Sequence, residues 1–186
     1  IRLISDEIYH GLVYEGTAET ALSHTDQSIV INSFSKYYCM TGWRIGWMVL
    51  PEDLVRPVER LAQSLFISAP YISQIAAIKA FDATPELDAI RALYARNRQK
   101  LLSALPQIGF ENLHPADGAF YVYADARRFT NDALEFSKSL LDSTGVAATP
   151  GVDFDPDNGQ TMMRFSYAGD EATIDRAIAA MARWLE

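Results

Sequence analysis

Short apolar runs near the start of the chain predict three buried strands. They cover residues 1–4, 28–32 and 45–50, and they are rich in isoleucine, valine and leucine. None of them alternates cleanly between apolar and polar positions. Runs of this kind are typical of strands that are covered on both faces in an α/β sheet. We therefore expect the first 50 residues to belong to an α/β domain.

A helical pattern, with apolar residues three or four positions apart, begins after Pro51. It predicts a helix over residues 54–66, in which Pro57 either produces a kink or marks the true start. Two more helices are expected at residues 73–82 and 86–105.

The last third of the chain mixes short strands with helices. Gly145 is the residue type expected just past the end of a helix, and Asp170 is a good N-cap for the last helix. We expect strands at residues 119–124, 146–149 and 162–167, and helices at 130–144 and from Asp170 to the end.

This pattern divides the chain into two blocks joined by a helix. We expect residues 1–50 to be the tail of a larger α/β domain, 51–69 to form a bridging helix, and 70–186 to form a small α+β domain. The first block is too short to build a covered sheet alone, and the chain opens on a strand without an initiating Met. We therefore expect the natural chain to extend further upstream.

Charge and composition narrow the classes of partner. The net charge of −8 disfavours general binding to nucleic acid or to an anionic membrane. No segment reaches the apolar length of a membrane span. A single cysteine, Cys39, excludes an internal disulfide framework, and the histidines lack the spacing of metal ligands. We expect a cytoplasmic protein without a metal site.

The segment from Ser33 to Gly46 carries the most informative chemistry. Lys36 follows a buried strand, where an ammonium group is costly unless it has a task, and Schiff-base formation is one such task. The hydroxyls of Ser33 and Ser35 and the guanidinium of Arg44 suit a bound phosphate. The segment can thus offer an amine that reacts with an aldehyde and a binding site for a phosphate. Pyridoxal 5′-phosphate (PLP) has both an aldehyde and a phosphate.

Ser-x-x-Lys followed by Gly-Trp-Arg-Ile-Gly resembles the cofactor-lysine signature of the class I and II aminotransferases, PLP enzymes of fold type I. The resemblance implies that Lys36 forms the Schiff base and that Ser33 and Arg44 bind the phosphate. It also implies a fold: the C-terminal part of the large PLP-binding domain, with a mostly parallel sheet, followed by the small C-terminal domain.

Two further segments resemble motifs of the same family. Residues 5–9 resemble its Asp-Glu-x-Tyr segment, which implies that Asp6 partners the ring nitrogen and Tyr9 donates to the phenolic oxygen. A carboxylate at that nitrogen keeps the ring cationic and improves it as an electron sink. Residues 163–166 resemble the Arg-x-Ser segment, which implies that Arg164 grips the α-carboxylate of the substrate.

Residues 114–121 and 149–154 resemble two small-domain segments near the substrate, so the likeness covers nearly the whole chain in the right order. Two departures leave the subfamily open. Residues 37–39, Tyr-Tyr-Cys, are bulkier than the small residues expected after the lysine, and Asp155 follows Phe154 where the family often has glycine.

Each candidate residue also has an ordinary structural interpretation. Lys36 could be a surface lysine and Asp6 a solvated strand end. Tyr9 could pack, Arg44 could join a salt bridge, and Arg164 could belong to an internal ion pair. Their combination in register favours the functional interpretation.

The resemblance implies an aminotransferase that passes an amino group between an amino acid and a 2-oxo acid. Lys36 would then move the proton between the substrate Cα and the cofactor as general base and acid. The family works as a homodimer, and its N-terminal half supplies other cofactor contacts. We therefore expect residues 1–186 alone to bind PLP weakly or not at all.

Two alternatives stay open from the sequence. One is another PLP enzyme of the same fold, such as a carbon–sulfur lyase or an enzyme of the cyclopropane-carboxylate synthase type. The other is the aminotransferase-like sensor domain of a transcription regulator.

Overall fold

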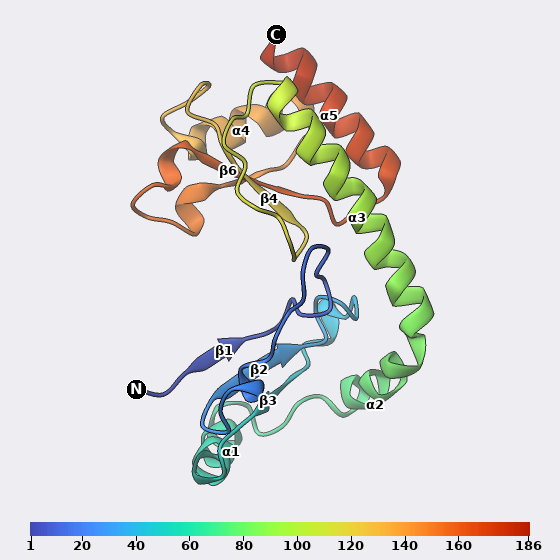
Figure 1. The fold of residues 1–186 in the computed structure, drawn as a ribbon, viewed down its shortest axis with the longest axis vertical. Helices are drawn as coiled ribbons and strands as arrows, with labels where there is room; N and C mark the ends of the chain where they lie inside the picture. The colour runs from blue at the N-terminus through green and yellow to red at the C-terminus, as the bar shows by residue number, and fades with distance from the viewer. The chain divides into compact units, whose positions relative to one another are not determined.

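The computed structural model describes all 186 residues as two compact units, residues 1–91 and 92–186. The boundary falls within the long helix α3 (Thr84–Gln107), which contributes its first turns to one unit and its remaining turns to the other. Figure 1 shows the order of the helices and strands along the chain. The domain boundaries at residues 50 and 69 stay a prediction.

The first unit contains a three-stranded sheet in the order β1-β2-β3 (Figure 1). Its strands are β1 (Ile4–Asp6), β2 (Ile29–Ser33) and β3 (Gly46–Val49). β1 and β2 are parallel, whereas β2 and β3 are antiparallel, with Ser33 opposite Gly46.

The expectation of a mostly parallel sheet is therefore wrong for these strands. A parallel neighbour needs a connection that runs back along the sheet, usually as a helix. The connection from β2 to β3 instead folds as turns at one end of the sheet, where Phe34 N donates to Ile45 O at 3.2 Å and Met40 N donates to Phe34 O at 3.0 Å. β3 consequently starts where β2 stops and runs in the opposite direction.

The helices of the first unit are α1 (Glu52–Phe66), α2 (Tyr71–Ala80) and the start of α3. Pro57 lies inside α1 and does not mark its start. One buried cluster of this unit consists of Phe34, Met40 and Ala77, so the loop that follows β2 packs on α2. This loop carries Lys36, so the position of Lys36 depends on that packing.

Much of the apolar surface of this unit is not covered by other residues of the chain. Val30 in β2 is buried, but all four residues of β3 are exposed, and α1 has no buried residue. The expectation that all three strands are covered on both faces is therefore wrong for residues 1–186. Large exposed apolar side chains on these elements are Trp47, Met48, Val49, Val55, Leu61, Leu65, Phe66, Tyr71, Ile72, Ile75 and Ile78.

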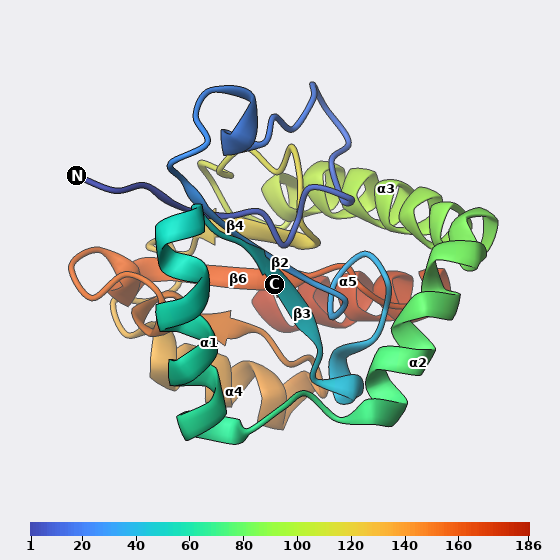
Figure 2. The ribbon, with the colours of Figure 1, turned by 90° about the horizontal axis from the view of Figure 1, so that it is seen from below.

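The second unit contains an antiparallel sheet in the order β4-β6-β5. Its strands are β4 (Tyr121–Asp125), β5 (Thr149–Pro150) and β6 (Met162–Ser166). The helices α4 (Ala133–Thr144) and α5 (Glu171–Leu185) lie against each other (Figure 2). The strand expected at 146–149 is reduced to the two residues of β5.

Capping residues set the ends of these helices as the sequence predicts. Asp170 accepts a hydrogen bond from Thr173 N at 2.8 Å and starts α5. Gly145 adopts a left-handed conformation, φ 71°, and ends α4. Asp132 caps the start of α4 by accepting from Glu135 N at 3.0 Å, so this helix begins later than the expected residue 130.

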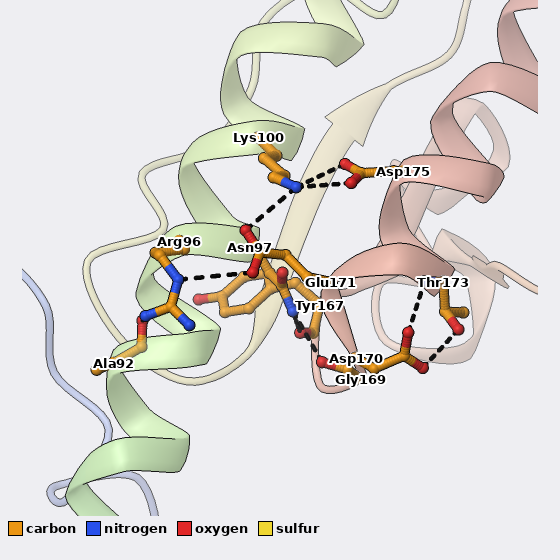
Figure 3. A network of polar contacts seen from close by, with 10 residues as sticks. All are labelled: Ala92, Arg96, Asn97, Lys100, Tyr167, Gly169, Asp170, Glu171, Thr173 and Asp175. Atoms are coloured by element: carbon orange, nitrogen blue, oxygen red, sulfur yellow. Dashed lines mark hydrogen bonds and ion pairs between the residues drawn. The ribbon is translucent and has the colours of Figure 1, made fainter.

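Hydrogen bonds and ion pairs fasten α3 to the connection between β6 and α5 (Figure 3). The amide of the fully buried Asn97 donates to Tyr167 O at 3.2 Å and to Gly169 O at 2.8 Å. Lys100 pairs with Asp175 at 2.7 Å and with Glu171 at 3.2 Å. This connection follows directly on β6, so the same contacts hold the strand that carries Arg164.

No helix of the chain meets both requirements for a membrane crossing, sufficient length and sufficient apolar character.

Candidate active site

The parallel pairing of β1 with β2 brings four of the candidate residues to one edge of the first sheet. Asp6 is the last residue of β1 and Ser33 is the last residue of β2, so the segments that follow both strands leave from the same edge. Open α/β sheets bind ligands at this edge. The amine of Lys36 lies 5.4 Å from the centre of the Tyr9 ring, which places an amine beside a phenol.

The turn after β1 is anchored by a buried carboxylate. Glu7 is 3% exposed and accepts hydrogen bonds from Ala21 N at 2.8 Å, Thr20 Oγ1 at 3.0 Å and Ser5 Oγ at 3.2 Å. Burial acts to raise the pKa of Glu7, but these hydrogen bonds outweigh it and hold the pKa below its usual value. Glu7 therefore stays ionised and fixes the backbone between Asp6 and Tyr9.

Sequence reasoning missed this role of Glu7. The sequence places two acids side by side, and no local pattern tells which of them faces the protein. Two of the groups that donate to Glu7, on Thr20 and Ala21, lie 13 and 14 residues downstream, so only the folded chain brings them to the carboxylate.

The loop after β2 is anchored by the residue next to the lysine. The Tyr37 ring packs on Gly11, and its hydroxyl donates to Asp88 Oδ1 at 2.8 Å. Burial and the nearby Asp88 carboxylate raise the pKa of Tyr37 to about 12. Tyr37 is bulkier than the small residue expected at this position, and its ring joins the Lys36 loop to the turn that carries Tyr9.

The phosphate-binding candidates lie on the tight connection between β2 and β3. Gly46 pairs with Ser33, and a Cβ on Gly46 would lie 2.6 Å from Asn32 O, so only glycine allows this approach. Arg44, two residues earlier, adopts a left-handed conformation, φ 50°, and donates to Thr41 O at 2.8 Å. Ser35 N donates to Ser33 Oγ at 3.0 Å.

The donor set at this edge fits PLP by its chemistry. A primary amine suits the aldehyde, hydroxyls and a guanidinium suit the phosphate, and the exposed carboxylate of Asp6 suits a protonated ring nitrogen.

Arg164 lies in the second unit, on the half-buried face of its sheet. Strand alternation buries Val122, Ala124, Met163 and Phe165 on the opposite face. Arg164 borders a cavity of about 370 Å³. The other residues that line this cavity are Pro115, Tyr121, Tyr123, Phe154 and Asp155.

The guanidinium of Arg164 lies over two aromatic rings. Its central carbon lies 4.2 Å from the centre of the Tyr121 ring and 3.9 Å from that of the Phe154 ring. The ion pairs of the chain do not include Arg164, so the alternative of an internal ion pair is not found.

Comparison with known proteins identifies the family to which these motifs belong. The family described as "Aminotransferase class I and II" matches residues 1–181, nearly the whole chain. The chain belongs to the class I and II aminotransferase family. This family is PLP-dependent.

Two curated relatives are similar to this chain over nearly its whole length. The valine–pyruvate aminotransferase of Mycobacterium tuberculosis is 50% identical over 189 residues, which cover 100% of this chain and 49% of the relative. The (5-formylfuran-3-yl)methyl phosphate transaminase of Methanocaldococcus jannaschii is 38% identical, with 98% of this chain and 50% of the relative covered.

The crystal structure of an aminotransferase from Mycobacterium tuberculosis has the same fold over the matched part. It superposes with a TM-score of 0.94 at 49% identity, covering 100% of this chain and 49% of the solved chain. The chain thus spans about half the length of the relatives it matches.

Proposed function

We propose that residues 1–186 are part of an aminotransferase that passes an amino group between an amino acid and a 2-oxo acid, with PLP bound to Lys36. The observation that carries the proposal is the Lys36 amine, 5.4 Å from the centre of the Tyr9 ring at the edge where β1 and β2 end. Family membership supports the reaction class.

Each candidate residue has a role that follows from its chemical groups. Asp6 offers a carboxylate to keep a proton on the ring nitrogen, and the Tyr9 hydroxyl donates to the phenolic oxygen. Ser33 and Arg44 hold the phosphate by charge-assisted hydrogen bonds. PLP, when bound, supplies an aldehyde for the substrate amine and a ring that delocalises the charge left at Cα.

Lys36 and Arg164 act on the substrate. The free Lys36 amine would take the proton from the substrate Cα as a general base and pass it, as a general acid, to the C4′ carbon of the cofactor. Arg164 binds the α-carboxylate with its paired N–H groups, which fixes the direction of the Cα–H bond.

Valine and pyruvate are the first substrate pair that we propose, because the relative that is 50% identical is a valine–pyruvate aminotransferase. The exposed apolar side chains on β3, α1 and α2 support the proposal that this surface is buried against the remainder of the protein or against a second subunit. We propose that the full-length protein is a homodimer. We also propose that it is located in the cytoplasm.

The experiment compares the full-length protein with its Lys36→Ala variant. We expect an absorbance band near the visible edge with PLP, fixed to the chain by borohydride in the wild type and absent in Lys36→Ala. Lys138→Ala, at an exposed position of α4, is the matched control and should keep the band. Covalent PLP in Lys36→Ala contradicts the lysine assignment.

Product analysis tests the reaction class. An aminotransferase is converted to its amino form by the donor amino acid and regenerated by a 2-oxo acid. Release of pyruvate and ammonia from a single substrate shows a lyase instead.

A further inference from the structure

We propose that Phe154 and Tyr121 are positioning residues that hold the Arg164 guanidinium between their rings, so that only its in-plane N–H edge can meet a substrate carboxylate. This inference rests on the proposed function, in which Arg164 binds the α-carboxylate. What it adds to that function is a role for the two rings, which determine that the N–H edge of the guanidinium faces the substrate.

The distances place both rings within the range of a cation–π contact. The guanidinium carbon lies 3.9 Å from the Phe154 ring centre and 4.2 Å from the Tyr121 ring centre, well inside the limit of about 6 Å. A guanidinium is planar and carries its N–H groups in that plane. Rings that lie against its two faces leave this edge free for a bidentate carboxylate.

Burial of apolar surface does not explain the position of Phe154. Its side chain is 52% exposed, whereas Phe110, Phe136 and Phe165 in the same unit are at most 8% exposed. Since an exposed phenylalanine gains little from the hydrophobic effect, we expect the backbone that carries Phe154 to contribute to the position of its ring.

The loop from Gly151 to Gly159 supplies that fixed backbone. Phe154 N donates to Gly151 O at 2.9 Å, and Gly159 N donates to Asp155 O at 2.9 Å. The Asp155 carboxylate also accepts from the backbone N–H groups of residues 157 and 158, each at 3.0 Å. A Cβ on Gly159 would lie 2.4 Å from the carbonyl carbon of Gly151, so the two ends of the loop touch.

This loop also accounts for the acid after Phe154. Asp155 stands where glycine is common in the family, and its carboxylate closes the loop from inside. The hydrogen bonds from Asn158 and Asp157 lower the pKa of Asp155, so the closing group stays ionised.

Tyr121 reaches Arg164 from the regular sheet. Tyr123 lies directly opposite Arg164, while Tyr121 is paired with Ser166, two residues further along β6 on the same face. Diagonal neighbours of this kind are within reach of long and aromatic side chains. One ring therefore comes from a strand and the other from a closed loop.

The experiment measures steady-state kinetics of full-length Phe154→Leu and Tyr121→Leu with an amino acid and a 2-oxo acid. We expect KM for both substrates to rise about tenfold in each variant, with kcat at saturation within about twofold of the wild type. The absorbance of the Lys36-bound cofactor and the midpoint of thermal unfolding should not change. Phe154→Tyr, which keeps a ring over Arg164, should restore the wild-type KM.

Phe129→Leu is the matched control, because Arg128 lies 5.9 Å from the Phe129 ring but neither residue lines the Arg164 cavity. It should leave KM unchanged. Direct binding of acetate, measured by calorimetry, provides a readout apart from turnover, and its dissociation constant should rise about tenfold in Phe154→Leu.

Arg164→Gln separates the failure of this inference from that of the proposed function. If Arg164→Gln leaves KM unchanged, the carboxylate role of Arg164 is wrong. If Arg164→Gln raises KM but Phe154→Leu and Tyr121→Leu do not, the proposed function stands and the positioning role of the rings is wrong. A fall in kcat at unchanged KM in the ring variants also overturns it.

Discussion

Gly11 and Tyr37 are in direct contact, and the space between them has no room for a side chain on Gly11. A Cβ there would lie 2.5 Å from Tyr37 Cγ. The contact joins the turn that follows β1 to the loop that carries Lys36, so two candidate cofactor-binding segments share one packing point.

Gly11→Ala should therefore disturb both segments. We expect the free energy of unfolding of the full-length protein to fall by about 1–3 kcal/mol, as in other overpacked sites. Cofactor occupancy, measured by the absorbance of the Lys36-bound PLP, should fall as well. Gly169→Ala, where a Cβ meets nothing within 4 Å, is the control and should change neither quantity.

Tyr37→Phe removes only the hydrogen bond to Asp88. We expect a loss of about 1 kcal/mol in the free energy of unfolding near neutral pH. The pKa of Tyr37 is raised to about 12, so the native state favours the protonated phenol. This stability is fully present below the ordinary tyrosine pKa of about 10 and is lost as the pH rises toward 12.

The measurement is denaturant unfolding between neutral and strongly alkaline pH. The difference in stability between the wild type and Tyr37→Phe should shrink over that alkaline interval. A difference that stays constant up to pH 12 would show that the Tyr37 hydroxyl does not carry the effect.

Glu7→Gln tests the buried carboxylate that anchors the Tyr9 turn. The pKa of Glu7 is lowered in the folded chain, so its contribution is present above the ordinary glutamate pKa of about 4.3 and is lost as the pH falls below it. We expect Glu7→Gln to lower the free energy of unfolding at pH 7 by about 1–3 kcal/mol.

Acid unfolding of the two proteins gives the second readout. The wild type should lose stability on acidification more steeply than Glu7→Gln does. Glu19→Gln is the control, because Glu19 and His24 form an exposed pair. An equal slope in the wild type and Glu7→Gln would contradict the role of the buried charge.

Asp155→Ala should loosen the Gly151–Gly159 loop without touching the rings themselves. Two backbone N–H groups lose their acceptor, so we expect KM for amino acid and 2-oxo acid to rise severalfold, about the effect of one lost charge-assisted hydrogen bond. Asp155→Asn keeps an acceptor oxygen and should stay near the wild-type KM. Equal KM in all three proteins would show that the loop needs no acceptor at this position.

Residues 1–186 expressed alone should bind PLP weakly or not at all. β3, α1 and α2 expose large apolar side chains within this chain, and we expect the isolated chain to self-associate and to bind a hydrophobic dye. A PLP titration followed by absorbance, compared with the full-length protein, checks this. Stoichiometric, tight binding by the isolated chain would contradict the expectation.

The positions of the helices show which features of the fold can be predicted from local sequence patterns. Apolar spacing and caps such as Asp170 and Gly145 placed α4 and α5 to within a few residues, because these signals lie inside the helix or next to it. The direction of β3 and the exposure of its four residues were not predicted, since both depend on what lies beside the strand in space.

The sequence by itself determined the family and the chemical groups, because Lys36, Arg44 and Arg164 stand in motifs that can be recognised in order along the chain. The tertiary structure alone decided which other residues hold these candidate site residues and their segments in place. Glu7 accepts hydrogen bonds from residues 20 and 21, Tyr37 packs on Gly11, and Arg164 lies over the rings of Phe154 and Tyr121. These contacts join residues that are distant in sequence, and only the packed backbone brings them within a few ångströms.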